Sequence, residues 1–131
     1  MTARLDLMLV DDDPCERIFY EDALEEVACG YTLAYAESGA DALAQLETAR
    51  PAVMILDLRM PGLSGFDVLK AVRERRGLEA MKIYMVSNSM IESDRVQAMA
   101  MGAQGYRVKP VSVDGYAELV DAVCALAGCE P

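Results

Sequence analysis

Short apolar runs alternate along the chain with stretches whose apolar residues recur every three or four positions. The runs have the length and composition of buried strands, and the stretches between them have the period of amphipathic helices. Alternating strands and helices build βαβ units, in which the strands run parallel and helices cover both faces of the sheet. We therefore predict an α/β fold of five βα units, with strands at residues 5–10, 31–36, 53–56, 82–86 and 105–108.

Helix start and stop signals follow the expected strands. Pro14 comes directly after Asp13, and a capping aspartate before a proline is a strong helix start. Ser38 is expected to open the second helix, which should end before Pro51. Apolar spacing places the remaining helices near residues 66–72, 92–101 and 113–126.

Length and charge narrow the class of protein. The 131 residues fit one domain, 1–131, with a core from about residue 5 to 126. Twelve basic and 22 acidic residues give a net charge of −10, which disfavours direct binding to nucleic acid or to a membrane surface. No apolar run approaches the roughly 18 residues of a membrane span, and the N-terminus lacks the layout of a signal peptide. We expect a cytoplasmic protein.

Histidine is absent from the sequence. Its absence excludes Ser-His-Asp and Cys-His catalysis and histidine-ligated zinc within this chain. The four cysteines contain no Cys-x-x-Cys pair, and in a reducing compartment we expect all of them to be free thiols. They are Cys15, Cys29, Cys124 and Cys129.

Polar residues stand at the ends of four expected strands. Asp11 and Asp12 follow the first strand and Asp57 follows the third, while Ser87 and Lys109 follow the fourth and fifth. Ligands of open parallel sheets bind outside the carboxyl ends of the strands. We therefore expect these five side chains to meet at one edge of the sheet.

The chemistry of this group points to phosphoryl transfer. Carboxylates at one site repel by about 4 kcal/mol per pair at 4 Å with an effective dielectric constant near 20, so they must take up protons or share a cation. Ligation by oxygen alone suits Mg²⁺. A lysine can neutralise a phosphoryl group and a serine can donate a hydrogen bond to it. Together these groups indicate phosphorylation of an aspartate.

Four short motifs occur in a fixed order along the chain. They are residues 9–14 (Leu-Val-Asp-Asp-Asp-Pro), 55–61 (Ile-Leu-Asp-Leu-Arg-Met-Pro) with Ser64-Gly65, 86–87 (Val-Ser) and 105–110 (Gly-Tyr-Arg-Val-Lys-Pro). Their order and spacing resemble the receiver domain of two-component response regulators over about residues 5–126. The resemblance implies a doubly wound parallel sheet in the flavodoxin-like order 2-1-3-4-5.

The resemblance also implies roles for the matching residues. Asp57 would accept the phosphoryl group. Asp12 would ligate Mg²⁺ directly, Asp11 would assist through water, and the backbone carbonyl of Arg59 would be the third protein ligand. Lys109 would pair with Asp57 and then with its phosphate.

Two further residues would form the switch. Ser87 would turn its hydroxyl towards the phosphoryl group, and Tyr106, expected to be half-buried, would move inward behind it. The peptide bond between Lys109 and Pro110 would be cis.

Two positions depart from the family pattern. Asn88 stands where the family usually has a small residue, and Arg59 places a long cation at the mouth of the pocket with Ser89 nearby. We expect these three residues to tune the rate of self-dephosphorylation.

Partners also follow from the resemblance. A sensor histidine kinase or a histidine phosphotransfer protein would be the phosphoryl donor, and an unidentified protein would be the downstream target. Docking, and a homodimer, are expected at the face formed by the fourth helix, fifth strand and fifth helix. Met90, Met99 and Met101 lie on or near this face, although we expect most of them to be core. The beginning and end of the chain favour a stand-alone regulator over a fragment.

Two other readings stay open from the residues. In the first, Asp11 is the nucleophile of a Mg²⁺-dependent phosphatase of haloacid-dehalogenase type, although Cys15 departs from that pattern and a later aspartate pair is missing. In the second, the chain is a constitutive binding module whose pocket does not switch. The favoured reading is a signalling switch that catalyses only its own phosphorylation and dephosphorylation.

Overall fold

The computed structural model describes residues 3–27 and 30–128, with side chains from residue 6 onward. Cys15 and Cys124 are free thiols, as expected. Cys29 and Cys129, for which we made the same prediction, lie outside the described residues.

Five parallel strands form one sheet in the order β2-β1-β3-β4-β5, which confirms the predicted fold class and strand order. The strands are β1 (Ala3–Val10), β2 (Leu33–Ala36), β3 (Ala49–Asp57), β4 (Lys82–Ser87) and β5 (Gly105–Val108). The helices are α1 (Pro14–Val27), α2 (Gly39–Gln45), α3 (Gly65–Glu74), α4 (Glu92–Ala100) and α5 (Val113–Leu126). In the part of the chain that is described, no helix is both long and apolar enough to cross a membrane.

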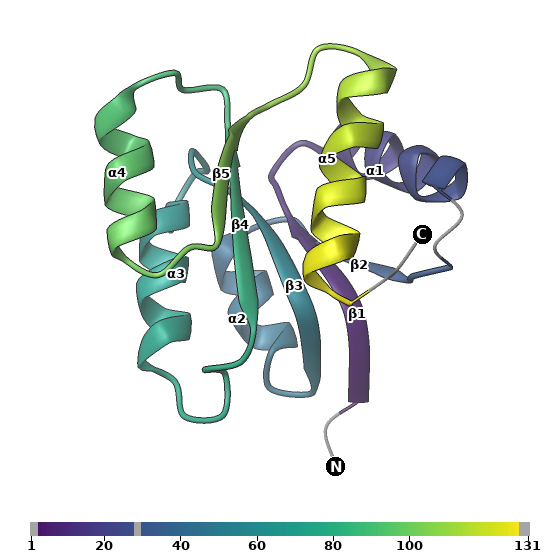
Figure 1. Cartoon of the computed structure of the whole chain (residues 1–131). Helices are drawn as coiled ribbons and strands as arrows, with labels where there is room; N and C mark the ends of the chain where they lie inside the picture. Colours follow the sequence, from purple (N-terminus) through teal and green to yellow (C-terminus); the bar gives the residue numbers. More distant parts are fainter. Residues whose placement is uncertain (1–2, 28–29, 129–131) are drawn as a thin grey trace.

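The helices cover the sheet on two faces. Helices α1 and α5 lie on one face, and α2, α3 and α4 lie on the other (Figure 1). Side chains alternate along each strand. In β1, Leu7 and Leu9 pack in the core beneath α1 and α5, whereas Met8 and Val10 pack in the core beneath the other three helices. Burial on both faces explains why the strands read as continuous apolar runs rather than as alternating ones.

Two of the expected helix starts are confirmed by their capping contacts. The carboxylate of Asp13 accepts a hydrogen bond from the backbone N–H of Cys15 at 3.0 Å. The hydroxyl of Ser38 accepts one from the backbone N–H of Asp41, also at 3.0 Å. Each contact satisfies one of the N–H groups that a helix start leaves unpaired.

Strand β3 begins four residues earlier than predicted and contains Pro51. Proline is tolerated here because this end of β3 is bordered by β1 alone: Pro51 is paired with Leu5 of β1, while the pairing of β3 with β4 starts only at Val53. The missing N–H therefore faces no ladder on that side.

At the edge where the strands have their carboxyl ends, the backbone at Gly65 lies very close to the end of β3. Its backbone N–H donates to the carbonyl of Leu58 at 2.8 Å, which folds the start of α3 back onto the end of β3. A side chain at position 65 would place its Cβ 2.6 Å from the backbone oxygen of Asp57. Only glycine fits, and the loop after Asp57 is held against the strand as a result.

Candidate functional site

Three carboxylates meet where β1 and β3 end, at the point where the strand order reverses. Ligand oxygens of Asp11, Asp12 and Asp57 lie within 4.8 Å of one another. Asp11 and Asp57 are buried, at 2% and 4% exposure, whereas Asp12 is exposed. The structure thus brings together three residues that the sequence placed at the ends of two different strands, and only one of them is open to solvent.

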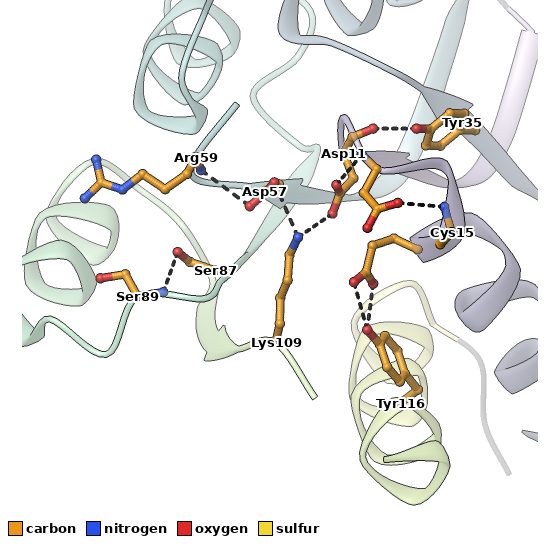
Figure 2. Close-up of polar contacts among 11 residues, drawn as sticks. Asp11, Cys15, Tyr35, Asp57, Arg59, Ser87, Ser89, Lys109 and Tyr116 are labelled. Atoms are coloured by element: carbon orange, nitrogen blue, oxygen red, sulfur yellow. Dashed lines mark hydrogen bonds and ion pairs between the residues drawn. The ribbon is translucent and has the colours of Figure 1, made fainter. Parts of the chain in front are cut away.

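Lys109 lies between the two buried carboxylates (Figure 2). Its Nζ is 3.0 Å from Asp11 Oδ2 and 3.5 Å from Asp57 Oδ2, so the contact with Asp11 is the shorter one. We expected Lys109 to pair with Asp57. The backbone N–H of Lys109 donates to the carbonyl of Ser87 at 2.8 Å, which ties the end of β5 to the end of β4.

Burial and repulsion set the charge state of this pocket. Burial, followed by the negative charge of Asp11, raises the pKa of Asp57 to about 6 even though Lys109 and the backbone N–H of Arg59 oppose the shift. Burial also raises the pKa of Asp11 against the backbone N–H of Asp13 and against Lys109. Burial alone would lower the pKa of Lys109, but the two carboxylates outweigh it and the pKa rises. One cation does not neutralise this pocket, which leaves it ready for a second positive charge.

Both expected switch residues contact Ser89. Ser87 is fully buried, and its Oγ accepts a hydrogen bond from the backbone N–H of Ser89 at 3.0 Å (Figure 2). The hydroxyl of Tyr106 donates to the backbone carbonyl of Ser89 at 3.1 Å, and the ring is half-buried as predicted.

The side chain of Arg59 turns away from the pocket (Figure 2). Its backbone N–H lies 3.4 Å from Asp57 Oδ1, but its guanidinium binds Asp94 on α4 at 2.8 Å, and the side chain as a whole is 60% exposed. The Arg59 cation, which we expected at the mouth of the pocket, is therefore paired with the carboxylate of Asp94 instead. Asn88 is exposed on the loop that follows β4.

The prediction of a cis bond between Lys109 and Pro110 is wrong. Both residues are described, and the described chain contains no cis peptide bond. The trans form is favoured intrinsically by about 0.5–1 kcal/mol before proline. With this bond trans, Lys109 already reaches both buried carboxylates, so the observed contacts do not require the cis form.

The methionines on the α4 side are more exposed than predicted. Met90 is 84% exposed and Met99 is 41% exposed, while Met101 packs partly against the core. The prediction that most of them belong to the core is wrong for Met90 and Met99. Apolar spacing cannot distinguish a helix face that packs on the sheet from one that faces solvent.

Sequence reasoning missed a buried pair behind the pocket. The carboxylate of Glu16, in the first turn of α1, accepts from the hydroxyl of Tyr116 on α5 at 2.7 and 3.0 Å. Burial raises the pKa of Glu16 despite this hydrogen bond. A groove of about 460 Å³ opens beside the pair, between α1 and the segment from Pro110 to Val113. A carboxylate in a first helical turn is common for electrostatic reasons, so the sequence carried no signal that this one is buried.

Asp94 was missed for the same reason. It stands in the first turn of α4, yet it is only 8% exposed and binds both Arg59 and Ser89. Asp94 and the exposed Glu92 are two residues apart, so they point to roughly opposite sides of α4, and Asp94 lies on the buried side with Ala98.

Comparison with known proteins gives a consistent family. The chain is 30% identical over 119 residues to protein PilH of Pseudomonas aeruginosa, covering 91% of this chain and 97% of PilH. It is 35% identical over 113 residues to the DNA-binding transcriptional regulator NtrC of Klebsiella pneumoniae, covering 86% of this chain but only 23% of NtrC.

Solved structures agree with these relatives. The chemotaxis response regulator CheY4 of Vibrio cholerae superimposes with a TM-score of 0.78 at 29% identity, covering 94% of this chain and 99% of CheY4. The sequence-family model of the response regulator receiver domain matches residues 7–123 of this chain. The chain therefore belongs to the response regulator receiver domains, the phosphoacceptor modules of two-component signalling.

Proposed function

We propose that Asp57 is the phosphoacceptor of this receiver domain. The observation that carries this assignment is the contact of Lys109 with two buried carboxylates, of which Asp57 has its pKa raised to about 6. Near neutral pH this carboxylate is mostly ionised and is only partly neutralised, so its oxygen can attack phosphorus. The Asp57 oxygen–phosphorus bond forms as the bond between phosphorus and the donor nitrogen breaks, and the imidazole stays on the donor.

The carboxylates fit Mg²⁺. The group that Asp11, Asp12 and Asp57 form contains only oxygen ligands, within 4.8 Å of one another. Hard oxygen ligands and a surplus of negative charge suit this ion. We assign Asp12 as a direct ligand, Asp57 as another, Asp11 as a ligand through water, and the Arg59 carbonyl as the third protein ligand. When bound, Mg²⁺ supplies positive charge for the phosphoryl oxygens.

The protein's own groups would then respond to the phosphoryl group. Lys109 would move its main contact from Asp11 to a phosphoryl oxygen, and Ser87 would donate its hydroxyl to another. Tyr106 would leave the Ser89 carbonyl and turn inward. Moving a population from 1:99 to 99:1 requires about 5.5 kcal/mol. Two or three charge-assisted hydrogen bonds of roughly 1.5–3 kcal/mol each supply that amount.

The output of the switch would be a change in protein contacts. The exposed apolar residues on α4, on the loop just before it and on β5 make this face suited to a protein target or to a second copy of the chain. They are Met90, Ile91, Val96, Met99 and Val108. The upstream donor would be a sensor histidine kinase or a histidine phosphotransfer protein, because this chain has no histidine of its own. We place the protein in the cytoplasm, as one receiver domain with its core at residues 5–126.

The rate of self-dephosphorylation would depend on residues around the pocket mouth. Asn88 is exposed beside the buried Ser87, and Arg59 and Ser89 share the Asp94 carboxylate. Phosphoryl lifetimes in Asn88→Ala and Arg59→Ala, compared with the parent, test this role, and unchanged lifetimes would exclude it.

Intact-mass measurement tests the phosphoacceptor directly. The purified chain is incubated with Mg²⁺ and a small-molecule acyl phosphate. We expect one added phosphoryl group on the parent, none on Asp57→Ala, and none on the parent when EDTA removes the metal. Asp114→Ala is the matched control, since Asp114 is an exposed aspartate in the first turn of α5. This variant should still take up one phosphoryl group. An adduct that persists in Asp57→Ala would refute the assignment.

A further inference from the structure

We propose that Asp94 is a positioning residue of the switch, and that its carboxylate holds the loop between β4 and α4 in the resting arrangement. This inference rests on the proposed function of Asp57, Ser87 and Tyr106. We call the hydrogen-bonded set of Arg59, Ser89 and Asp94 the clasp.

One carboxylate oxygen makes both contacts of the clasp. Asp94 Oδ2 accepts from Arg59 Nη2 at 2.8 Å and from Ser89 Oγ at 2.8 Å. The first partner comes from the loop after β3 and the second from the loop after β4. Asp94 itself belongs to α4, so a single buried oxygen joins the two loops to the helix.

Ser89 passes the constraint to both switch residues. Its backbone N–H donates to Ser87 Oγ at 3.0 Å, and its backbone carbonyl accepts from Tyr106 at 3.1 Å. Its hydroxyl also accepts from the backbone N–H of Ile91 at 3.2 Å while it donates to Asp94. The hydroxyl, the N–H and the carbonyl of Ser89 are all engaged at once.

These hydrogen bonds of Ser89 oppose the side-chain movements that phosphorylation requires. Tyr106 must release the Ser89 carbonyl before it can turn inward, and Ser87 is held by the Ser89 N–H. The clasp fixes the position of Ser89 and thereby stabilises the partners that both residues must leave. It also holds the Arg59 guanidinium on the α4 side, away from the charge that develops on Asp57. Weakening the clasp should therefore populate the switched arrangement before any phosphoryl group arrives.

A purely local role for Asp94 would look different. Carboxylates in a first helical turn stabilise the helix through its dipole without long-range partners, and Glu92 does so while paired with Arg95 in the same helix. Asp94 is instead buried against two other loops, and Ile91, at the start of α4, provides no side-chain cap. The contacts of Asp94 thus connect elements, whereas those of Glu92 stay within one helix.

Two measurements on Asp94→Ala test the clasp. The first is residue-specific amide hydrogen exchange in the unphosphorylated protein, read at Ser89 and Ile91. We expect exchange at both amides to be faster by about tenfold, as the loss of part-buried, charge-assisted contacts should allow. The second is the rate at which a small-molecule acyl phosphate, with Mg²⁺, phosphorylates the protein. We expect this rate to rise about three- to tenfold, because the competent arrangement is more populated.

Matched variants separate positioning from simple helix capping. Glu92→Ala removes a carboxylate from the same turn and should leave both readouts at the parent values. Asp94→Asn keeps the shape and one acceptor oxygen and should restore part of the parent behaviour. Ser89→Ala leaves the Arg59–Asp94 ion pair in place and should change both readouts in the same direction as Asp94→Ala, which keeps the test decisive if Asp94→Ala does not fold.

Three outcomes would overturn the inference or its basis. If amide exchange at Ser89 and Ile91 is no faster in Asp94→Ala than in Glu92→Ala, no clasp holds the loop. Faster exchange with an unchanged or slower phosphorylation rate would reduce Asp94 to a helix cap. A parent protein that takes up no phosphoryl group would refute the proposed function itself, a failure that the exchange rates cannot imitate.

Discussion

Two sites in this molecule place a basic side chain against one or more carboxylates. They differ in burial and in the ratio of positive to negative charges. At the pocket, Lys109 is 11% exposed and faces Asp11 and Asp57, whose side chains are 3% and 5% exposed. At the clasp, the side chain of Arg59 is 60% exposed and faces the single carboxylate of Asp94, whose side chain is 11% exposed. The pocket places one largely buried cation against two buried anions. The clasp is open on one side and has one cation for one anion, with a hydroxyl in addition.

The difference explains what each site can do. An unbalanced buried site stores electrostatic repulsion that a metal ion or a proton can relieve, so it responds strongly to ligands and to pH. A balanced, half-exposed pair contributes little to stability and instead fixes the relative position of the elements that it joins. The four predictions below measure this contrast, in order of decreasing effect.

Lys109→Met should break the pocket. The change leaves two buried carboxylates without their cation, and the free energy of unfolding should fall by about 3 kcal/mol at pH 7.5 in EDTA. Part of the loss should be regained near pH 5, where protons replace the lysine. Urea unfolding at both pH values measures the effect. Lys70→Met, on the exposed side of α3, is the control, and an equal loss in both variants would contradict the idea of an unbalanced pocket.

Asp57→Asn should stabilise the metal-free protein. The folded-state pKa of Asp57 is about 6, above its ordinary value, so the folded chain binds the proton more tightly than the unfolded chain does. This contribution to stability is fully present below about pH 4 and is lost as the pH rises through about 6. We expect Asp57→Asn to gain about 1–2 kcal/mol at pH 7.5 in EDTA and to gain much less at pH 4. A gain that does not depend on pH would contradict the assigned cause.

Mg²⁺ binding should depend on the same protons. The pKa values of both Asp11 and Asp57 are raised, so bound protons compete with the metal below about pH 6. The apparent affinity should rise with pH up to that point, by at most about tenfold per pH unit for each proton released. Isothermal titration between pH 5 and 8 measures the slope. The slope should be shallower in Asp57→Asn, and an equal slope in both proteins would exclude Asp57 as a source of the protons.

Arg59→Met should have the smallest effect on stability. The ion pair with Asp94 is largely exposed on the arginine side, and the free energy of unfolding should change by less than about 0.5 kcal/mol. Urea unfolding in parallel with Lys109→Met gives the comparison directly. A loss similar to that of Lys109→Met would mean that the clasp and the pocket are energetically alike.

Much of the fold could be predicted from local sequence patterns. The apolar runs that became β1, β3 and β4 are buried on both faces, and their composition alone distinguishes them from surface strands. The capping residues Asp13 and Ser38 act through contacts two or three residues away, so sequence proximity was sufficient to identify them. Errors arose where a strand end lacked a neighbour on one side, as at Pro51.

The functional edge was accessible for a topological reason. Parallel strands in a doubly wound sheet bring their carboxyl ends to the same edge, so residues as distant as Asp11 and Lys109 become neighbours once the strands are recognised. The motif order also indicated the family, which the match over residues 7–123 shows. The cis bond at Pro110 was carried over from the resemblance alone, and the structure corrects it.

The sequence by itself determined the order of strands and helices, where the helices start and which side chains reach the edge of the sheet, because each depends on composition, short-range contacts or strand direction. Only the tertiary structure decided which of two acidic residues in one helical turn is buried, that Arg59 binds Asp94 rather than facing Asp57, and that Lys109 lies closer to Asp11. Those outcomes depend on how α4 and the loops pack against one another. Glu92 and Asp94 carry the same charge on opposite sides of α4, and the packing decides which side is covered.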